Sequence, residues 1–194
     1  MTTEKSVVDR YATMNKHQRI DTIFRLYGTI LRIVKSYEDI ISEEIMENII
    51  SNRRAGCINL GIKMSGYNMS NPTCRDATDH ADIIHMIRYG NLDDLLDGID
   101  GGECYREEIL KLRQIRCEYA DVERAMYILG EAERKEFRDV LLKKKTLDGF
   151  AEDNSILYES AKKRLYRNRN RVRKHAIELM NRRKERMYYG KKSL

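Results

Sequence analysis

A long apolar stripe near the middle of the chain is the feature that most constrains its fold. Large apolar side chains recur at steps of three and four residues, and they are Tyr105, Ile109, Leu112, Ile115, Tyr119, Val122, Met126 and Leu129. This spacing places them on one face of an α-helix and excludes a strand, whose faces alternate at every second residue. A helix of about 25 residues is about 40 Å long, so its apolar face must be covered by other helices.

The N-terminal part of the chain carries a second stripe with the same spacing. Apolar residues over 18–53 predict one long helix with a break near Ser36. Because this helix offers a matching apolar face, we favour packing within the chain over dimerisation through the stripe at 105–129.

The region between these two helices is less regular. Its Gly, Asn, Ser and Pro residues predict an irregular loop at about 54–80. The Asn71-Pro72 step disfavours helix at the residue before the proline. Short helices are expected at about 75–89 and 92–98.

Together these patterns predict an all-α fold with three segments. Residues 1–102 form a helical N-terminal region, 103–130 form a connecting or oligomerising helix, and 131–194 form a C-terminal domain with a basic extension. One Pro among 194 residues is too few for the turns of a β-sandwich or barrel. Without a signal peptide or an apolar run of about 18 residues, we expect no membrane contact and a location in the cytoplasm of a bacterial host cell.

Charge is unevenly distributed along the chain. From Lys162 to Leu194 there are 14 Lys and Arg against two acidic residues, which leaves 23 basic and 29 acidic residues in the other 161. A basic arm on an acidic body most often meets nucleic acid. If about six to eight phosphates are contacted, a plot of the logarithm of the binding constant against the logarithm of the salt concentration should have a slope of about −5 to −7.

The segment from residue 131 to residue 175 predicts two short helices and a long basic one. We expect the first two over 131–145 and 147–153, followed by a turn at Asp153-Asn154-Ser155. The third begins between residues 156 and 160 and runs past His175, towards Arg186. Its apolar stripe comprises Tyr158, Ala161, Leu165, Val172, Ala176 and Leu179.

The opposite faces of this third helix carry basic and amide side chains. A helix with such a face fits the major groove of DNA, where Arg pairs with guanine and Asn with adenine while other cations bind phosphates. The candidate DNA-binding residues are Ser160, Lys162, Lys163, Arg164, Tyr166, Arg167, Arg169, Asn170, Arg171, Arg173 and Lys174. Among them, Lys163, Arg167 and Asn170 are the candidate base contacts.

About 50 residues, from Leu129 to Met180, resemble a known DNA-binding unit. Leu129, Glu133 and Arg134 enter the first helix, Phe150-Ala151 stands at an aliphatic-Ala pair, and Leu165-Tyr166-Arg167-Asn168-Arg169 matches a Tyr/Arg-rich recognition helix. The run resembles the helix-turn-helix of the promoter-binding C-terminal domain of sigma factors. It is more similar still to bacteriophage late-gene regulators of the ArpU and RinA type. The remainder of the chain resembles those regulators in layout only.

The resemblance implies a sequence-specific regulator of transcription that is not an enzyme. Promoter DNA would be its partner, with RNA polymerase and a second copy of the chain as further candidates. The spacing departs from the family, since Ala151 and Ser160 are nine positions apart where the family has fewer. Either Ser155 is the true helix cap and Leu157 fills the serine position, or the turn is longer.

Two other functions also fit a basic helix. One is a DNA-binding structural adaptor, such as the small terminase subunit of a phage packaging machine, and the other is an RNA-binding protein with an Arg-rich arm. The four Cys and four His residues lack the pairing typical of zinc ligands, so we expect no metal and no cofactor. The sequence also contains no phosphate-binding glycine loop and no nucleophile motif.

Overall fold

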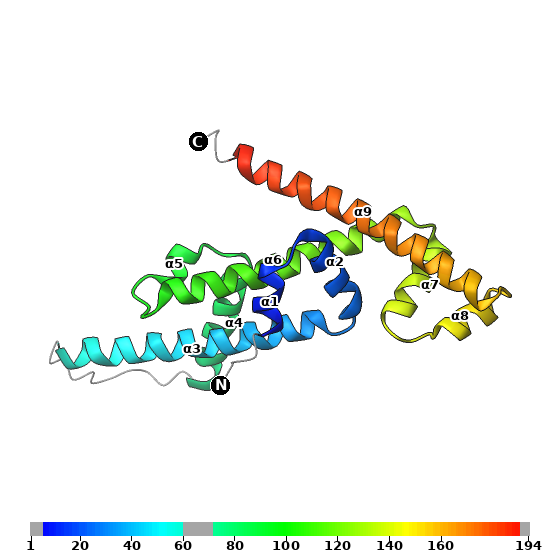
Figure 1. The fold of residues 1–194 in the computed structure, drawn as a ribbon. Coiled ribbons are helices and arrows are strands. Elements are labelled where there is room, and N and C mark those ends of the chain that lie inside the picture. Colours follow the sequence, from blue (N-terminus) through cyan, green and yellow to red (C-terminus); the bar gives the residue numbers. More distant parts are fainter. Residues whose placement is uncertain (1–5, 60–71, 191–194) are drawn as a thin grey trace, which may run out of the picture. The chain divides into compact units, whose positions relative to one another are not determined.

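The computed structural model describes residues 6–59 and 72–190, and within these ranges it contains helices and no strand (Figure 1). The expected all-α fold is confirmed. The helices are α1 (Val7–Thr13), α2 (Lys16–Arg25), α3 (Ile30–Asn59), α4 (Pro72–Tyr89), α5 (Leu92–Leu96), α6 (Gly102–Ala125), the short 3-10 helix η1 (Met126–Ile128), α7 (Glu131–Leu141), α8 (Leu147–Asp153) and α9 (Tyr158–Gly190). In the described part of the chain, no helix is both long and apolar enough to cross a membrane.

The chain packs as two units. The first comprises residues 1–32 and 114–194, and the second comprises residues 33–113. The boundaries fall inside α3 and α6, so each of these helices belongs to both units. This division differs from the three consecutive segments expected from the sequence, because the N-terminal helices group with residues 114–194.

The second unit has an apolar core and two arginine side chains that make polar contacts between its helices. Its buried residues come from α3, α4, α5 and the first half of α6, and include Ile41, Ile45, Ile83, Ile87, Leu92, Leu96, Ile109 and Leu112. Arg113 donates to the carbonyl oxygens of Met86, Ile87 and Gly90 at 2.6–2.9 Å. These carbonyls lie at the C-terminal end of α4, where the helix dipole is negative, so a cation there stabilises the helix end. Arg88 binds the buried carboxylate of Glu38 at 2.7 Å.

Two expectations about the N-terminal half were wrong. The break in the helix predicted over 18–53 lies between Arg25 and Ile30, not near Ser36. The expected loop at about 54–80 is helical at both ends, since α3 continues to Asn59 and α4 begins at Pro72. Proline is favourable as the first residue of a helix, because a backbone N–H at that position would have no hydrogen-bond partner within the helix. The middle of that loop, residues 60–71, lies outside the described residues.

In the first unit, the stripe on α6 is buried as the sequence predicts. Ile115, Val122 and Met126 are each at most 1% exposed. Two acidic residues on the same helix are also buried, which apolar spacing does not predict. Tyr11 donates to Glu118 Oε2 at 2.6 Å and Arg19 lies 3.2 Å from the same atom. These contacts tie α1 and α2 to α6.

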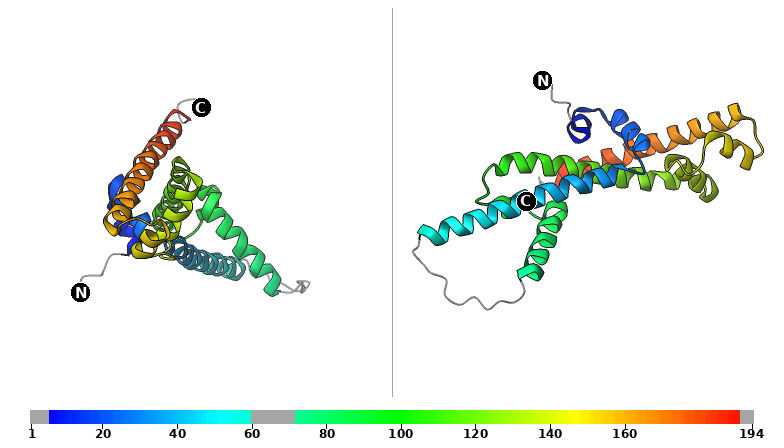
Figure 2. Two further views of the ribbon diagram at one scale, coloured as in Figure 1. Left: turned by 90° about the vertical axis from the view of Figure 1, so that its right-hand side faces the viewer. Right: turned by 90° about the horizontal axis from the view of Figure 1, so that it is seen from below.

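The C-terminal helix is the longest element of the first unit. It lies against α8 at its start and against α2 further along (Figure 2). Its buried side is formed by Ala161, Val172, Ala176 and Met180. The helix therefore has a packed side and, opposite it, a side that other molecules can reach.

Candidate nucleic-acid interface

A small apolar core holds α7, α8 and α9 together. Phe150 and Ala151 of α8 and Ala161 of α9 are buried in contact with one another. Partly buried residues from all three elements and the turn pack around them, and these are Val140, Leu147, Ile156 and Leu165. The start of α9 is thus fixed on α8 by a core that the sequence pattern predicts well.

The turn between α8 and α9 follows a specific hydrogen-bond pattern. Ser155 has a φ angle of 52°, in the left-handed region. Its N–H donates to the carbonyl of Glu152 at 3.0 Å, and the N–H of Ile156 donates to that of Ala151 at 3.0 Å. This pair of bonds is the Schellman motif that ends many helices. Ser155 therefore ends α8 and does not cap α9, which begins at Tyr158.

The end of α7 repeats this motif with a lysine. Lys143 has a φ angle of 57°, and its N–H donates to the carbonyl of Val140 at 3.0 Å. The N–H of Lys144 donates to that of Asp139 at 2.9 Å. Consequently α7 ends at Leu141, four residues before the predicted end at Lys145.

One flank of α9 is fastened to α7 by Arg164. Its Nη1 donates to Asn154 Oδ1 at 2.8 Å, and its Nη2 lies 3.5 Å from Glu136 Oε2. Asn154 in turn donates to Glu136 Oε1 at 3.0 Å. The guanidinium also lies 5.6 Å from the centre of the Phe150 ring, within the range of a cation–π contact. Arg164 thus connects the first short helix, the turn and the long helix.

Arg171 lies on the same flank, two turns further along. Its Nη1 is 3.6 Å from Glu133 Oε2, and its Nη2 donates to the carbonyl of Ile128 at 3.1 Å. Glu133 is also 3.9 Å from Arg164 Nε, so one carboxylate of α7 faces both arginines.

The other flank of α9 is fastened to α2 by two arginines. Arg169 and Arg173 both bind Asp21 Oδ1, at 3.0 Å and 2.5 Å. Arg169 also lies over the ring of Phe24, 5.2 Å from its centre. These contacts cover one side of α9 with α2, a helix that is distant from it in sequence.

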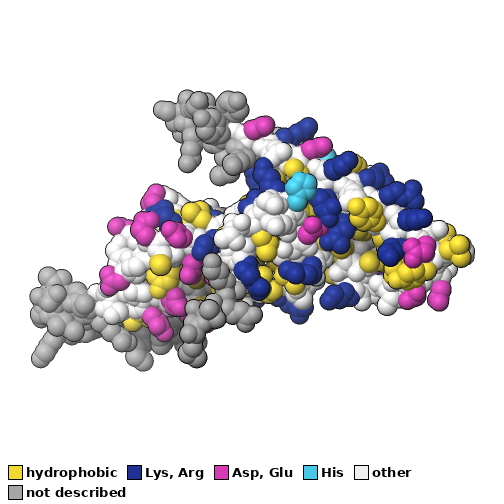
Figure 3. All heavy atoms as spheres, viewed as in Figure 1, with side chains coloured by type: hydrophobic (Ala, Val, Ile, Leu, Met, Phe, Trp, Pro, Cys, Tyr) yellow, Lys and Arg dark blue, Asp and Glu magenta, His cyan; other side chains and the backbone are white. Residues whose placement is uncertain are grey.

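Between the two flanks, α9 presents a row of side chains that we call its front: Lys163, Tyr166, Arg167, Asn170 and Lys174. At 100° per residue these positions share one side of the helix, opposite the buried residues. Lys163, Arg167 and Lys174 are exposed and have no acidic partner in the described part of the chain, and Tyr166 is 64% exposed. Lys and Arg side chains gather along α9 on the face drawn in Figure 3.

Asn170 is the only member of the front with a side-chain partner among the described residues. Its Oδ1 accepts a hydrogen bond of 2.6 Å from Arg173 Nη1. The amide NH2 of Asn170 remains without a described partner. Arg167 bonds only within its own helix, to the carbonyl of Lys163 at 3.4 Å.

The remaining predicted residues divide between exposed and covered positions. Ser160 and Lys162 are exposed in the first two turns of α9. Tyr158 was expected in the apolar stripe but is 46% exposed, and the preceding Leu157 is 80% exposed. The buried stripe of α9 begins instead at Ala161.

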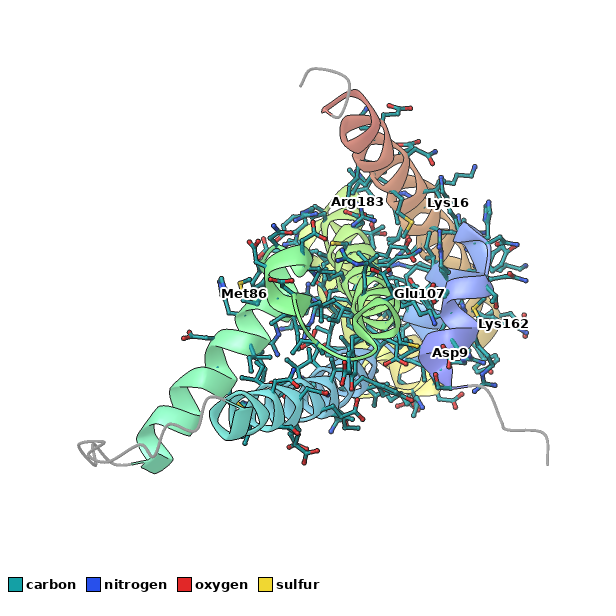
Figure 4. All side chains as sticks on the ribbon, turned by 90° about the vertical axis from the view of Figure 1, so that its left-hand side faces the viewer. Asp9, Lys16, Met86, Glu107, Lys162 and Arg183 are labelled. Atoms are coloured by element: carbon teal, nitrogen blue, oxygen red, sulfur yellow. The ribbon has the colours of Figure 1, made fainter. Side chains whose placement is uncertain are left out.

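The C-terminal half of α9 is fastened by contacts that sequence analysis missed. Arg183 Nη2 lies 2.9 Å from Asp121 Oδ2 on α6, and Lys16 at the start of α2 donates to Asn181; Arg183 and Lys16 are labelled in Figure 4. Burial raises the pKa of Asp121 above its ordinary value, although Arg183 and Arg124 favour its charged form. In the sequence, the position of an acidic residue within the apolar stripe of α6 is the signal that could have indicated this contact.

The structure therefore separates the predicted DNA-binding residues into two groups. Lys162, Lys163, Arg167 and Lys174 have no acidic partner among the described residues, whereas Arg164, Arg169, Arg171 and Arg173 bind acidic residues of α7 or α2. Compared with known proteins, the chain matches no family model, and no curated protein or solved structure is significantly similar to it.

Proposed function

We propose that this chain is a sequence-specific DNA-binding regulator of transcription. In this proposal α7, α8 and α9 form a helix-turn-helix unit, and α9 is the recognition helix. The observation that carries it is the front of α9, where three exposed cations without acidic partners among the described residues and a partly exposed amide share one side of a helix.

The dimensions and chemistry of the front suit the major groove. From residue 163 to residue 174 the front is about 16 Å long, and the groove is about 12 Å wide and accepts an α-helix. Lys163 and Lys174, at the two ends, suit phosphate contacts. Arg167 and Asn170 lie between them, and these residue types pair with guanine and adenine.

The fastening of both flanks supports the same proposal. Recognition of bases requires side chains held in place by a rigid scaffold. Arg164 and Arg171 hold one flank against α7, and Arg169 and Arg173 hold the other against α2. The covered arginines position the helix, and the exposed residues between them make the contacts.

The finer parts of the proposal depend on the resemblance to sigma-like regulators of phages. Action at promoters, origin in a phage or prophage, contact with RNA polymerase and dimerisation are included on that ground. Tyr127 and Ile128, which are 69% and 44% exposed on η1, form an apolar spot suited to a protein partner.

The test is a selection of bound duplexes from a random DNA library, at about 0.15 M salt, with the full chain. We expect one discrete sequence motif. The same selection is repeated with Arg167→Ala and with Asn170→Ala, and with Lys135→Ala as a matched control on the exposed side of α7. The first two variants should each lose preference at one or two base positions, and the control should return the wild-type motif.

Two results would contradict this function. If wild-type protein retains all duplexes equally, the binding is electrostatic only and a packaging adaptor becomes the better account. If single-stranded RNA competes better than any duplex, the protein binds RNA through its basic arm.

A further inference from the structure

A cleft in the first unit lies on the flank of α9 that faces α2. It has a volume of about 870 Å³ and is bordered by α2, the end of α7 and the middle of α9. Its charged lining consists of Asp21, Arg25, Lys143, Arg169 and Arg173. The front of α9 contributes no side chain to its lining, although Arg173 of the lining also donates a hydrogen bond to Asn170 of the front.

The charges around this cleft do not balance. Four cations surround a single carboxylate, Asp21, which already binds both Arg169 and Arg173. Arg25 and Lys143 are exposed and have no acidic partner in the described part of the chain. Cations gathered in a concave site raise the local concentration of anions.

The two arginines also have unused hydrogen-bonding capacity. The Nε atoms of Arg169 and Arg173 lack a hydrogen-bond partner among the described residues, but protein atoms cover them, so the donors left for a ligand in the cleft are those of the terminal Nη groups. A guanidinium offers five N–H donors in a planar fork, which matches the oxygens of a phosphate group. One carboxylate oxygen shared between two such forks leaves donors available for a second anion.

The rest of the lining is apolar or neutral. Met14, Phe24, Val140 and Leu141 contribute apolar surface, and Gln18 and Thr22 contribute polar groups. Pockets for small organic ligands combine mostly apolar walls with a few converging polar groups. The cleft therefore offers a cationic side for an anionic group and apolar walls for a ring or chain attached to it.

We propose that this cleft binds a phosphate group, with Arg25, Lys143, Arg169 and Arg173 as its donors. The phosphate competes with Asp21 for the two arginines of α9. It can come from a free nucleotide, whose base would use the apolar walls, or from the backbone of a nucleic acid bound along α9. This inference goes beyond the proposed function, because the cleft and the front of α9 use different residues.

The first measurement is calorimetric titration of the full chain with ATP, with pyrophosphate and with adenosine. ATP and pyrophosphate should bind, and adenosine, which lacks phosphate, should not. The double variant Arg25→Gln, Lys143→Gln should weaken ATP binding about tenfold, because each lost ionic contact contributes a few-fold in affinity. The matched control Arg10→Gln, Lys135→Gln removes the same charge from exposed positions of α1 and α7 and should bind ATP as the wild type does.

A second variant tests the competition with Asp21. Asp21→Asn removes the internal competitor while keeping the shape of the side chain, so ATP should bind several-fold more tightly. Weaker binding by Asp21→Asn, with an unchanged helical circular dichroism spectrum, would contradict the competition.

The second measurement distinguishes the two sources of phosphate. If neither ATP nor pyrophosphate binds but Arg25→Gln, Lys143→Gln weakens duplex binding and lowers its salt slope by about 2, the phosphate belongs to nucleic acid. If the double variant changes neither nucleotide nor duplex binding, the proposal is overturned. Loss of duplex binding on changing the front of α9, with ATP binding retained, would concern the DNA-binding function alone.

Discussion

Replacement of Arg164 by alanine tests the claim that this arginine holds α7, the turn and α9 together. Its guanidinium hydrogen-bonds Asn154, lies near Glu136 and Glu133, and covers the ring of Phe150. Arg164→Ala removes all four contacts and leaves the amide of Asn154 and the two carboxylates with fewer partners.

The cost can be worked from those contacts. A hydrogen bond from a charged donor contributes about 1.5–3 kcal/mol. The two ion pairs are longer, at 3.5 Å and 3.9 Å, and the side chain of Arg164 is 32% exposed, so solvent screening reduces each to at most about 0.5 kcal/mol. Since water replaces part of what is lost, we expect Arg164→Ala to lower the free energy of unfolding by about 2 kcal/mol.

The assay is urea unfolding of the full chain, followed by far-ultraviolet circular dichroism. Arg167→Ala is the matched control, because it removes an arginine from the next turn of the same helix that bonds only to its own backbone. The control should change stability by less than about 0.5 kcal/mol. Equal stabilities for Arg164→Ala and Arg167→Ala would refute the assignment of Arg164 as a positioning residue.

Three further changes test other parts of the fold. Ser155→Gly should stabilise the chain by about 0.5–1 kcal/mol, because glycine adopts the left-handed conformation without strain. Ser160→Gly, inside α9, should destabilise the chain by about 0.5 kcal/mol. Thermal unfolding that ranks the two variants in the reverse order would contradict the left-handed turn at Ser155. Phe150→Ala should cost about 3–5 kcal/mol in urea unfolding, and a cost under about 1 kcal/mol would mean that the small core is not formed. Burial raises the pKa of Asp121 above its ordinary 3.8, so the folded state takes up a proton more readily than the unfolded one. The wild type should therefore lose stability relative to Asp121→Asn as pH rises from about 4 through the raised pKa. A stability difference that stays constant between pH 4 and pH 7 would show that the carboxylate of Asp121 is not perturbed.

The regular elements of this fold could be predicted because their apolar spacing is local. The stripe from Tyr105 to Leu129 predicts α6, and the predicted bounds of 147–153 coincide with α8. Two helix boundaries were predicted wrongly. Pro72 disfavours helix before it but is favourable as the first residue of α4, and the apolar spacing over 18–53 hides the break at 26–29, where Gly28 lies.

The candidate site could be predicted only as a set of residue types on one helix. The basic side of α9 follows from spacing, but the acidic partners of its arginines do not. Asp21 lies 148 positions before Arg169, and nothing local indicates that the two meet. Asn168 illustrates the same limit, because it stands among the basic residues in sequence yet is 4% exposed on the packed side.

The central claim is that DNA is bound along the front of α9. The most direct test is the salt dependence of duplex binding by the full chain. The front carries three cations without an acidic partner among the described residues, so contacts by these three predict a slope of about −2.7, shallower than the value of about −5 to −7 expected from the sequence.

The decisive comparison uses two double variants with equal charge. Lys163→Gln, Lys174→Gln should reduce the slope by about 1.8, whereas Arg10→Gln, Lys135→Gln should leave it unchanged. Equal slopes for the two double variants would contradict the claim that DNA is bound along the front of α9.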